Sequence, residues 1–216
     1  RRHQKILEEG PWLSDEIRKE IGDKVVAGAK AVGYCGLATF EFLRDSRGDF
    51  YFLEVNPRVQ VEHTVTEMIT GTDLVSMGIR VASGESIKLI QDDIQIRGHA
   101  IQVRLNAENP VTLSPSPGKL WECHWPGGPG VRIDTHAHTG YDMPASFDSL
   151  LAKLIVWAPT RDESISKLIA ALHEIKLLGV DTLIPLHLAI LSENDFRKRD
   201  ITIHYLEEHP NLLSGG

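Results

Sequence analysis

Residues 39–56 read Thr39-Phe-Glu-Phe-Leu-Arg-Asp-Ser-Arg-Gly-Asp-Phe-Tyr-Phe-Leu-Glu-Val-Asn56. Two aromatic-rich halves flank a polar break at residues 46–49, and this pattern predicts a β-hairpin. Because side chains alternate along a strand, a turn centred on residues 47 and 48 fixes which residues face each other on one side of the hairpin. The expected pairs on that side are Glu41–Glu54, Thr39–Asn56 and Leu43–Phe52.

The facing carboxylates Glu41 and Glu54 are the chemically informative pair. Two like charges directly opposite each other destabilise a ladder, so a cation is expected to compensate them. Mg²⁺ is commonly held by one or two carboxylates, with phosphate oxygens and water completing its octahedron. The hairpin alone also allows a simpler interpretation, in which both glutamates point into water.

Length and composition exclude several classes of protein. The 216 residues suffice for one domain and part of another, and the formal net charge of −7 argues against nonspecific binding to nucleic acid. The sequence has no apolar run of about 18 residues, so we expect no membrane partner. Two cysteines, Cys35 and Cys123, suggest no disulfide framework and favour a reducing compartment. We therefore expect a cytoplasmic protein, or a mitochondrial one if its source is eukaryotic.

Hydrophobic periodicity and turn signals outline two parts joined by a connection over residues 83–97. The pattern is typical of an α+β fold, with a small antiparallel sheet and helices in the second part. Expected helices lie near residues 14–33, 64–70, 73–82, 161–178 and 183–191. Expected strands besides the hairpin lie near residues 100–106, 120–125, 131–135, 150–157 and 201–207, and the first of these is expected to be half-buried.

The run that follows the hairpin, Glu54-Val-Asn-Pro-Arg-Val-Gln-Val-Glu-His63, resembles the signature of biotin carboxylases, which are members of the ATP-grasp superfamily. Four further segments resemble the family in the same order: residues 1–5 (RRHQK), 65–73, 97–109 and 115–119. The Ile203-His-Tyr-Leu206 run completes the pattern. The resemblance implies the second half of an ATP-grasp domain (residues 1–88), followed by the biotin carboxylase C-terminal α+β domain (residues 99–208).

The resemblance also implies a role for individual residues in an ATP-dependent ligase that carboxylates biotin. The implied metal ligands for Mg²⁺ or Mn²⁺ are Glu41, Glu54 and Asn56. ATP would contact His3, Glu41, Leu43, Glu54 and Ile203, while bicarbonate would be held by Lys5, Arg58, Gln60 and the backbone of Val61. Glu62 would be the general base, Arg58 a second catalytic residue, and Arg104 would stabilise the enolate of biotin.

The implied partners are a biotin carboxyl carrier protein and a carboxyltransferase, and the implied assembly is a homodimer. The final acceptor stays open among acetyl-CoA, propionyl-CoA, methylcrotonyl-CoA, pyruvate and urea. Compared with the family pattern, the sequence lacks the N-terminal α/β domain and the ATP-grasp lid with its lysines. We therefore interpret it as a fragment that is inactive alone.

Two alternatives remain open. The chain is either catalytic within a larger carboxylase or a folded module that carries subunit contacts only. Another ATP-grasp ligase, such as a carbamoyl-phosphate synthetase half, shares the Glu, Glu and Asn pattern of the metal site. The Gln60-Val-Glu-His63 run and the strand that carries Arg104 argue against a carbamoyl-phosphate synthetase half. Pro57 and Thr64 replace residues common in the family, and neither is an implied ligand.

Overall fold

The computed structural model describes residues 5–213 and divides the chain into two compact units. One unit runs from Pro11 to Arg97, and the other combines the residues up to Gly10 with those from Gly98 onward. The sequence pattern predicts a connection over residues 83–97, and the family resemblance implies a domain boundary between residues 88 and 99. The structure in addition groups the N-terminal strand with the later part of the chain.

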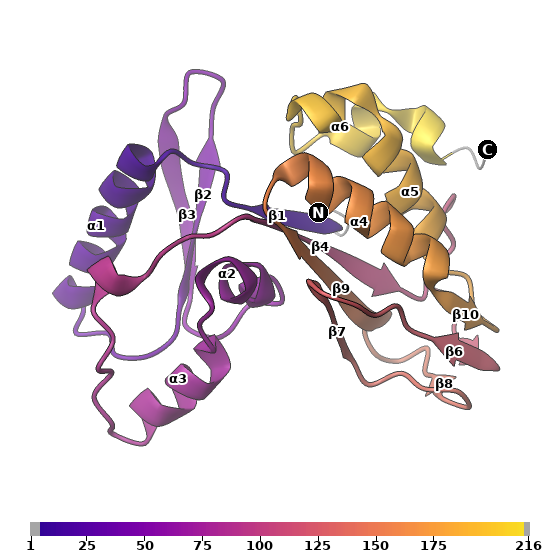
Figure 1. Ribbon diagram of the computed structural model, residues 1–216, viewed down its shortest axis with the longest axis horizontal. Helices are drawn as coiled ribbons and strands as arrows, with labels where there is room; N and C mark the ends of the chain where they lie inside the picture. The colour runs from indigo at the N-terminus through magenta and orange to yellow at the C-terminus, as the bar shows by residue number, and fades with distance from the viewer. Residues whose placement is uncertain (1–4, 214–216) are drawn as a thin grey trace. The chain divides into compact units, whose positions relative to one another are not determined.

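The Pro11–Arg97 unit contains a helix, a hairpin and two further helices (Figure 1). Its elements are α1 (Asp15–Ala31), β2 (Thr39–Arg44), β3 (Phe50–Asn56), α2 (His63–Thr70), α3 (Leu74–Ala82) and the 3₁₀ turn η1 (Gln91–Asp93). The helix predicted after Ser14 is confirmed. Ser14 Oγ accepts the Ile17 N–H, and Gly33, in the left-handed region at φ 64°, ends the helix.

The hairpin pairs Glu41 with Glu54, as predicted. The prediction that Leu43 lies opposite Phe52 is wrong, because Leu43 pairs with Tyr51. The loop causes the difference: Asp45 N–H bonds to Asp49 O and closes a turn that is one residue out of step with the predicted register. A bulge beyond Glu41 absorbs that extra residue, so the carboxylate pair keeps its predicted register.

The second unit is built on an antiparallel sheet of four strands in the order β1-β4-β9-β7. These strands are β1 (Leu7–Gly10), β4 (His99–Asn106), β9 (Leu150–Ala158) and β7 (Val131–Thr135). Helix α4 (Arg161–Glu174) packs against β4 and β9 (Figure 1). Thr160, at the N-cap position, forms a capping box with Glu163. The core lies between this helix and the sheet, with Ile101, Leu154 and Leu168 fully buried.

Smaller elements complete this unit. Two short pairs are β5 (Gly118–Lys119) with β8 (Asp142–Met143), and β6 (Glu122–His124) with β10 (Lys176–Leu178). The C-terminal part contains α5 (Ile184–Ser192), α6 (Asn194–Lys198), α7 (Tyr205–Glu208) and the 3₁₀ turn η2 (Pro210–Leu213). In the described part of the chain, no helix is both long and apolar enough to cross a membrane.

Three predictions for this unit are corrected. The helix predicted to reach residue 178 ends at Glu174, because Ile175 is extended and the next residues pair with β6. Residues 201–207 form no strand, since the Thr202 side chain accepts the His204 N–H and a turn leads into α7. Strand β4 is not half-buried: its alternate residue Gln102 is completely buried, because the neighbouring strands β1 and β9 and their side chains cover it.

Candidate active site

The two hairpin carboxylates are bridged by an amide. Asn56 Nδ2 lies 3.1 Å from Glu41 Oε1 and 3.0 Å from Glu54 Oε1, and it donates to both. All three residues come from the paired ends of β2 and β3, where the predicted register holds. The repulsion expected between facing carboxylates is therefore relieved in part by a shared N–H donor.

The loop after β3 extends this cluster. Gln60, which is buried, donates from Nε2 to Glu41 Oε1 at 3.1 Å. Arg58 donates to Gln60 Oε1 and to Asn56 Oδ1, both at 3.3 Å. Five predicted site residues thus form one hydrogen-bonded network, which we call the hairpin network: Glu41, Glu54, Asn56, Arg58 and Gln60.

A hard divalent cation fits the donors of the hairpin network. The two carboxylates offer oxygen ligands, which Mg²⁺ prefers. A half-turn of the Asn56 amide exchanges Nδ2 for Oδ1, so the residue can either bridge the carboxylates or join them as a third oxygen ligand. Among residues 5–213, no cluster of three or more His, Cys, Asp or Glu side chains provides a complete metal site. Phosphate oxygens and water would therefore have to complete the coordination.

Val61 and Glu62 lie on the turn that leads into α2. Glu62 occupies the N-cap position, and its side chain makes no capping hydrogen bond. His63 Nδ1 lies 2.7 Å from Gln60 O, which ties the start of the helix to the hairpin network. The helix therefore begins directly beside the residues predicted to hold bicarbonate.

Arg104 belongs to the other unit, on β4, and is paired with Glu8 of β1. Arg104 Nε lies 2.7 Å from Glu8 Oε1, and Nη2 contacts the same oxygen. The second Glu8 oxygen accepts from Gln102 Nε2 at 2.9 Å. Both side chains of the ion pair are mostly buried, with 18% of Arg104 and 15% of Glu8 exposed.

A row of charges crosses the sheet at Arg104. Lys153 of β9 lies opposite Arg104, and Asp134 of β7 lies opposite Lys153. Lys153 Nζ is 3.3 Å from Asp134 Oδ2, and Arg132 Nε is 2.7 Å from Asp134 Oδ1. The row has one more cation than carboxylate, since Arg104, Lys153 and Arg132 face Glu8 and Asp134. This balance suits the binding of an anion.

The backbone of Arg104 is held from both sides. Its N–H bonds to Ile6 O at 3.1 Å, and its carbonyl lies 2.8 Å from His187 Nε2 of α5. A carbonyl can only accept, so Nε2 is the protonated nitrogen of the neutral imidazole. Burial lowers the pKa of His187 to about 4, while the hydrogen bond to Arg104 acts in the opposite direction. His187 is therefore neutral at pH 7.

This pKa predicts an acid-sensitive contribution to stability. The folded-state pKa lies below the ordinary value of 6.5, so the unfolded state binds the proton more readily. The free energy of unfolding should fall as the pH drops from about 6.5 to 4, by about 3 kcal/mol from this residue. Denaturant unfolding of the chain at several pH values measures the effect.

His187→Gln keeps an N–H donor but removes the titrating group, so its unfolding should depend less on pH across this window. His173→Gln, at an exposed position of α4, is the matched control and should retain the wild-type dependence. An unchanged pH dependence in His187→Gln would show that other groups cause the loss of stability.

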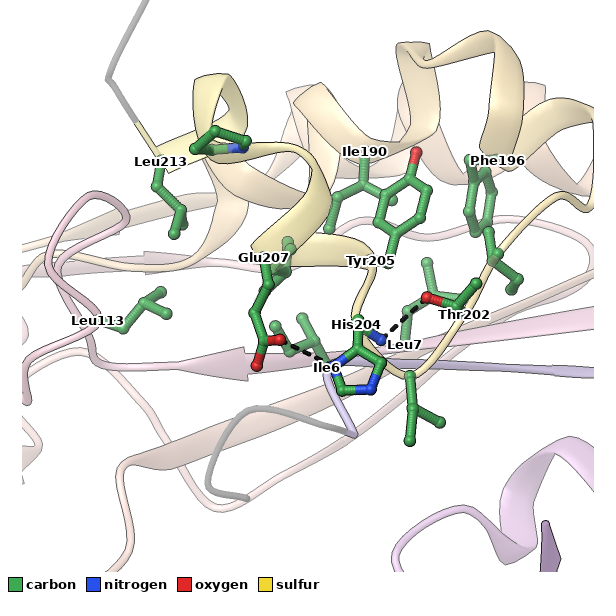
Figure 2. A pocket seen from close by; sticks show the side chains of 14 residues that line it. Ile6, Leu7, Leu113, Ile190, Phe196, Thr202, His204, Tyr205, Glu207 and Leu213 are labelled. Carbon is green, nitrogen blue, oxygen red and sulfur yellow. Dashed lines mark hydrogen bonds and ion pairs between the residues drawn. The ribbon is translucent and has the colours of Figure 1, made fainter.

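The remaining predicted residues come from both units. His3 lies outside the described residues, and Lys5, in the second unit, is exposed. Leu43 is 43% exposed on β2. Ile203 lines a mainly apolar cavity of about 580 Å³ in the second unit, together with Ile6, Phe196 and Tyr205 (Figure 2). His204 and Glu207 also line this cavity, and His204 Nδ1 lies 2.8 Å from the Glu207 carboxylate.

Sequence reasoning missed the residues that surround Arg104. Glu8 accepts a hydrogen bond from the Arg104 side chain, and Gln102 donates to the Glu8 carboxylate. His187 contacts the Arg104 carbonyl. Glu8 and Arg104 are 96 positions apart in the sequence. The only available signal was the acidic pair Glu8-Glu9 in an otherwise apolar context, and it does not specify a partner.

Two family descriptions match successive parts of the chain. Residues 1–90 match the ATP-binding domain of the carbamoyl-phosphate synthase L chain. Residues 102–208 match the biotin carboxylase C-terminal domain. An ATP-binding domain of this kind followed by that C-terminal domain defines the class of ATP-grasp carboxylases, and the α+β fold agrees with it.

Individual relatives that match the chain are named biotin carboxylases. The biotin carboxylase of Allochromatium vinosum is 47% identical over 210 residues, which cover 96% of this chain and 46% of the relative. The chloroplastic biotin carboxylase of Arabidopsis thaliana is 47% identical over 217 residues, which cover 99% of this chain and 40% of the relative. This chain belongs to the biotin carboxylase family and corresponds to the C-terminal half of its members.

A solved structure agrees closely with the fold. The biotin carboxylase domain dimer of Hydrogenobacter thermophilus 2-oxoglutarate carboxylase, in complex with MgADP, ADP and bicarbonate, superimposes with a TM-score of 0.97 at 43% identity. The match covers 100% of this chain and 48% of that one. The chain thus spans about half the length of the relatives that it matches.

Proposed function

We propose that these residues form the catalytic C-terminal half of a biotin carboxylase, which uses MgATP and bicarbonate to carboxylate biotin on a carrier protein. The hairpin network carries this proposal. It places two carboxylates, two amides and a guanidinium in direct contact on one hairpin and the loop that follows it. Carboxylates that hold a cation beside an anion-binding arginine are what a reaction between ATP and bicarbonate requires.

Bound Mg²⁺ would neutralise the charge of the ATP phosphates, with Glu41, Glu54 and Asn56 as its protein ligands. Lys5, Arg58, Gln60 and the Val61 N–H would hold bicarbonate. Glu62 takes the bicarbonate proton, and the resulting oxygen attacks the γ-phosphate, giving carboxyphosphate and ADP. His3, Leu43 and Ile203 would contact the nucleotide.

Biotin is carboxylated in the second half of the proposed reaction. Carboxyphosphate breaks down to CO₂ and phosphate, and the phosphate accepts the ureido N–H proton of biotin. Arg104 stabilises the biotin enolate, which forms a bond to CO₂ through its nitrogen. A guanidinium suits this role because it stays charged and presents a planar fork of donors to an oxyanion.

The proposed partners are a biotin carboxyl carrier protein and a carboxyltransferase, with a homodimer as the assembly. The structural relative from Hydrogenobacter thermophilus is described as a dimer, which supports the last point. Bacterial relatives support a cytoplasmic location. We also propose that residues 1–88 belong functionally to the ATP-grasp domain and residues 99–208 to the C-terminal domain, even though β1 pairs with β4.

A carbamoyl-phosphate synthetase half is the second candidate, because residues 1–90 match an ATP-binding domain named after that enzyme. The match of residues 102–208 to the biotin carboxylase C-terminal domain favours the first candidate. Bicarbonate-dependent ATP cleavage with free biotin as the acceptor distinguishes the two, since only a biotin carboxylase forms carboxybiotin. The test uses the full-length protein, because the 216 residues alone are expected to be inactive.

Neutralising either hairpin carboxylate should weaken the binding of Mg²⁺. In the full-length protein, Glu41→Gln and Glu54→Gln each remove one negative charge but keep the side-chain length. We expect the Mg²⁺ concentration that gives half-maximal rate to rise about tenfold, which corresponds to ~1.4 kcal/mol. Steady-state ATP cleavage at varied Mg²⁺ measures this change.

Glu85→Gln provides the control for both variants. Glu85 forms an exposed ion pair with Arg80 at 2.8 Å, away from the hairpin network, so its loss should leave the Mg²⁺ dependence unchanged. Wild-type rates for both hairpin variants at limiting Mg²⁺ would show that the carboxylates do not hold the cation.

A further inference from the structure

We propose that Glu8 is a positioning residue for Arg104: its carboxylate fixes the guanidinium in the orientation that meets the biotin oxyanion. This inference rests on the function proposed above for Arg104. Glu8 itself contacts no substrate in the proposed scheme. It acts through the ion pair that joins β1 to β4.

The geometry of the ion pair restricts the guanidinium. Nε and Nη2 of Arg104 both meet Glu8 Oε1, so one complete edge of the planar group is engaged by a single oxygen. An arginine held along one edge cannot rotate about its last side-chain bonds without breaking a charge-assisted contact. The orientation of the opposite edge is thereby fixed as well.

The carboxylate is itself held in place. Glu8 Oε2 accepts from Gln102 Nε2 at 2.9 Å, and Gln102 is completely buried. Glu8 and Gln102 also face each other in the register of β1 and β4. The chain of contacts therefore runs from a buried amide, through a carboxylate with both oxygens engaged, to the guanidinium.

The backbone removes the remaining freedom. The Arg104 N–H bonds to Ile6 O, and its carbonyl lies 2.8 Å from His187 Nε2. The segment that enters β1 and the strand itself thus supply a backbone acceptor and a side-chain acceptor to the same arginine. Long flexible side chains lose much rotamer entropy on binding, so an arginine that is already ordered loses less when it meets its ligand.

The charge row explains why the ion pair does not cancel the binding of an anion. Lys153 lies opposite Arg104 and forms an ion pair with Asp134. Arg132 contacts the same Asp134 carboxylate. Three cations and two carboxylates leave the row with a net positive charge. Glu8 can therefore orient Arg104 while the surroundings still attract an oxyanion.

The test compares two reactions of the full-length protein, which are bicarbonate-dependent ATP cleavage and carboxylation of free biotin. We expect Glu8→Gln to lower kcat for biotin carboxylation about 10- to 100-fold, the range found when groups that orient a functional side chain are removed. ATP cleavage should change much less. The ratio of ATP cleaved to biotin carboxylated should therefore rise, and this ratio does not depend on how much of the protein is folded.

Companion variants sharpen the result. Glu8→Asp keeps the charge on a shorter side chain and should recover part of the activity, and Gln102→Leu should produce a smaller loss in the same direction. Glu85→Gln breaks an exposed Arg–Glu pair of comparable length and should leave the ratio unchanged. A wild-type ratio in Glu8→Gln, or faster biotin carboxylation, would overturn the proposal, and faster carboxylation would show that Glu8 competes with the oxyanion.

Arg104→Ala separates this inference from the function on which it rests. If Arg104→Ala leaves biotin carboxylation intact, the proposed role of Arg104 is wrong. If Arg104→Ala impairs carboxylation while Glu8→Gln does not, only the positioning role is wrong.

Discussion

Arg58→Ala is expected to lower ATP cleavage and biotin carboxylation together in the full-length protein, whereas Arg104→Ala should lower biotin carboxylation far more than ATP cleavage. Arg58 belongs to the hairpin network, where it contacts Asn56 and Gln60 beside the two carboxylates. In the proposed scheme its loss affects the step at which bicarbonate meets the γ-phosphate, and both later products depend on that step.

Arg104 lies on β4 of the other unit, and its ion pair with Glu8 places it among different neighbours. In the proposed scheme it acts after carboxyphosphate has formed, so carboxyphosphate can still form and decay without it. Removing one charge-assisted contact to a developing oxyanion typically costs about 10²–10³ in rate. We expect losses of this size for both reactions in Arg58→Ala and for carboxylation alone in Arg104→Ala.

Both reactions are measured on both variants, with phosphate release reporting ATP cleavage and free biotin as the acceptor. Arg80→Ala, which removes an exposed arginine paired with Glu85, is the control. Equal losses of the two activities in Arg104→Ala would mean that this arginine also serves bicarbonate. The division of labour between the two arginines would then be wrong.

The sequence predicted the parts of the candidate site that depend on local patterns. That Glu41 lies opposite Glu54 follows from the alternation of side chains along two strands joined by a turn. This pairing is observed because a bulge after Glu41 compensates the register shift that the loop introduces. Leu43 lies beyond that bulge, so its predicted partner was wrong. One extra residue in the turn shifts the register of the two strands, and the periodicity of the strand residues does not reveal such a shift.

Contacts between distant segments were not predictable in this way. Strand β1 has four residues, two of them glutamates, and it gains its strand conformation by pairing with β4. Lys176–Leu178 continues a helical pattern but forms a strand, because β6 supplies hydrogen bonds that helix propensity does not anticipate. The partners of Arg104 depend on the same long-range pairing, so the candidate site was predicted without them.

Glu9 and Arg161 form the buried ion pair whose disruption should destabilise the fold most. Arg161 Nε lies 2.7 Å from Glu9 Oε2, and Nη2 lies 3.0 Å from Glu9 Oε1. His99 Nε2 lies 2.8 Å from the same carboxylate. Burial acts to raise the pKa of Glu9, but the hydrogen bonds from His99 and Arg161 outweigh it and lower the pKa.

Arg161 also connects the start of α4 to α6. Its Nη1 donates to Arg197 O at 2.8 Å and its Nη2 to Phe196 O at 2.9 Å, and the guanidinium lies over the Phe196 ring. Only 8% of the Arg161 side chain and 5% of the Glu9 side chain are exposed. One side chain thus joins β1, α4 and α6.

Arg161→Met should therefore lower the free energy of unfolding by about 3–5 kcal/mol, because it leaves Glu9 charged and buried and removes the donor from two carbonyls. Denaturant unfolding of the 216-residue chain, followed by circular dichroism, measures the change. Arg80→Met breaks the exposed Arg80–Glu85 pair and should cost at most about 1 kcal/mol. Adding Glu9→Leu to Arg161→Met should recover part of the loss, since the buried carboxylate that has lost its guanidinium partner is then absent. A cost for Arg161→Met no larger than that for Arg80→Met would show that the buried pair does not hold α4 and α6 to β1.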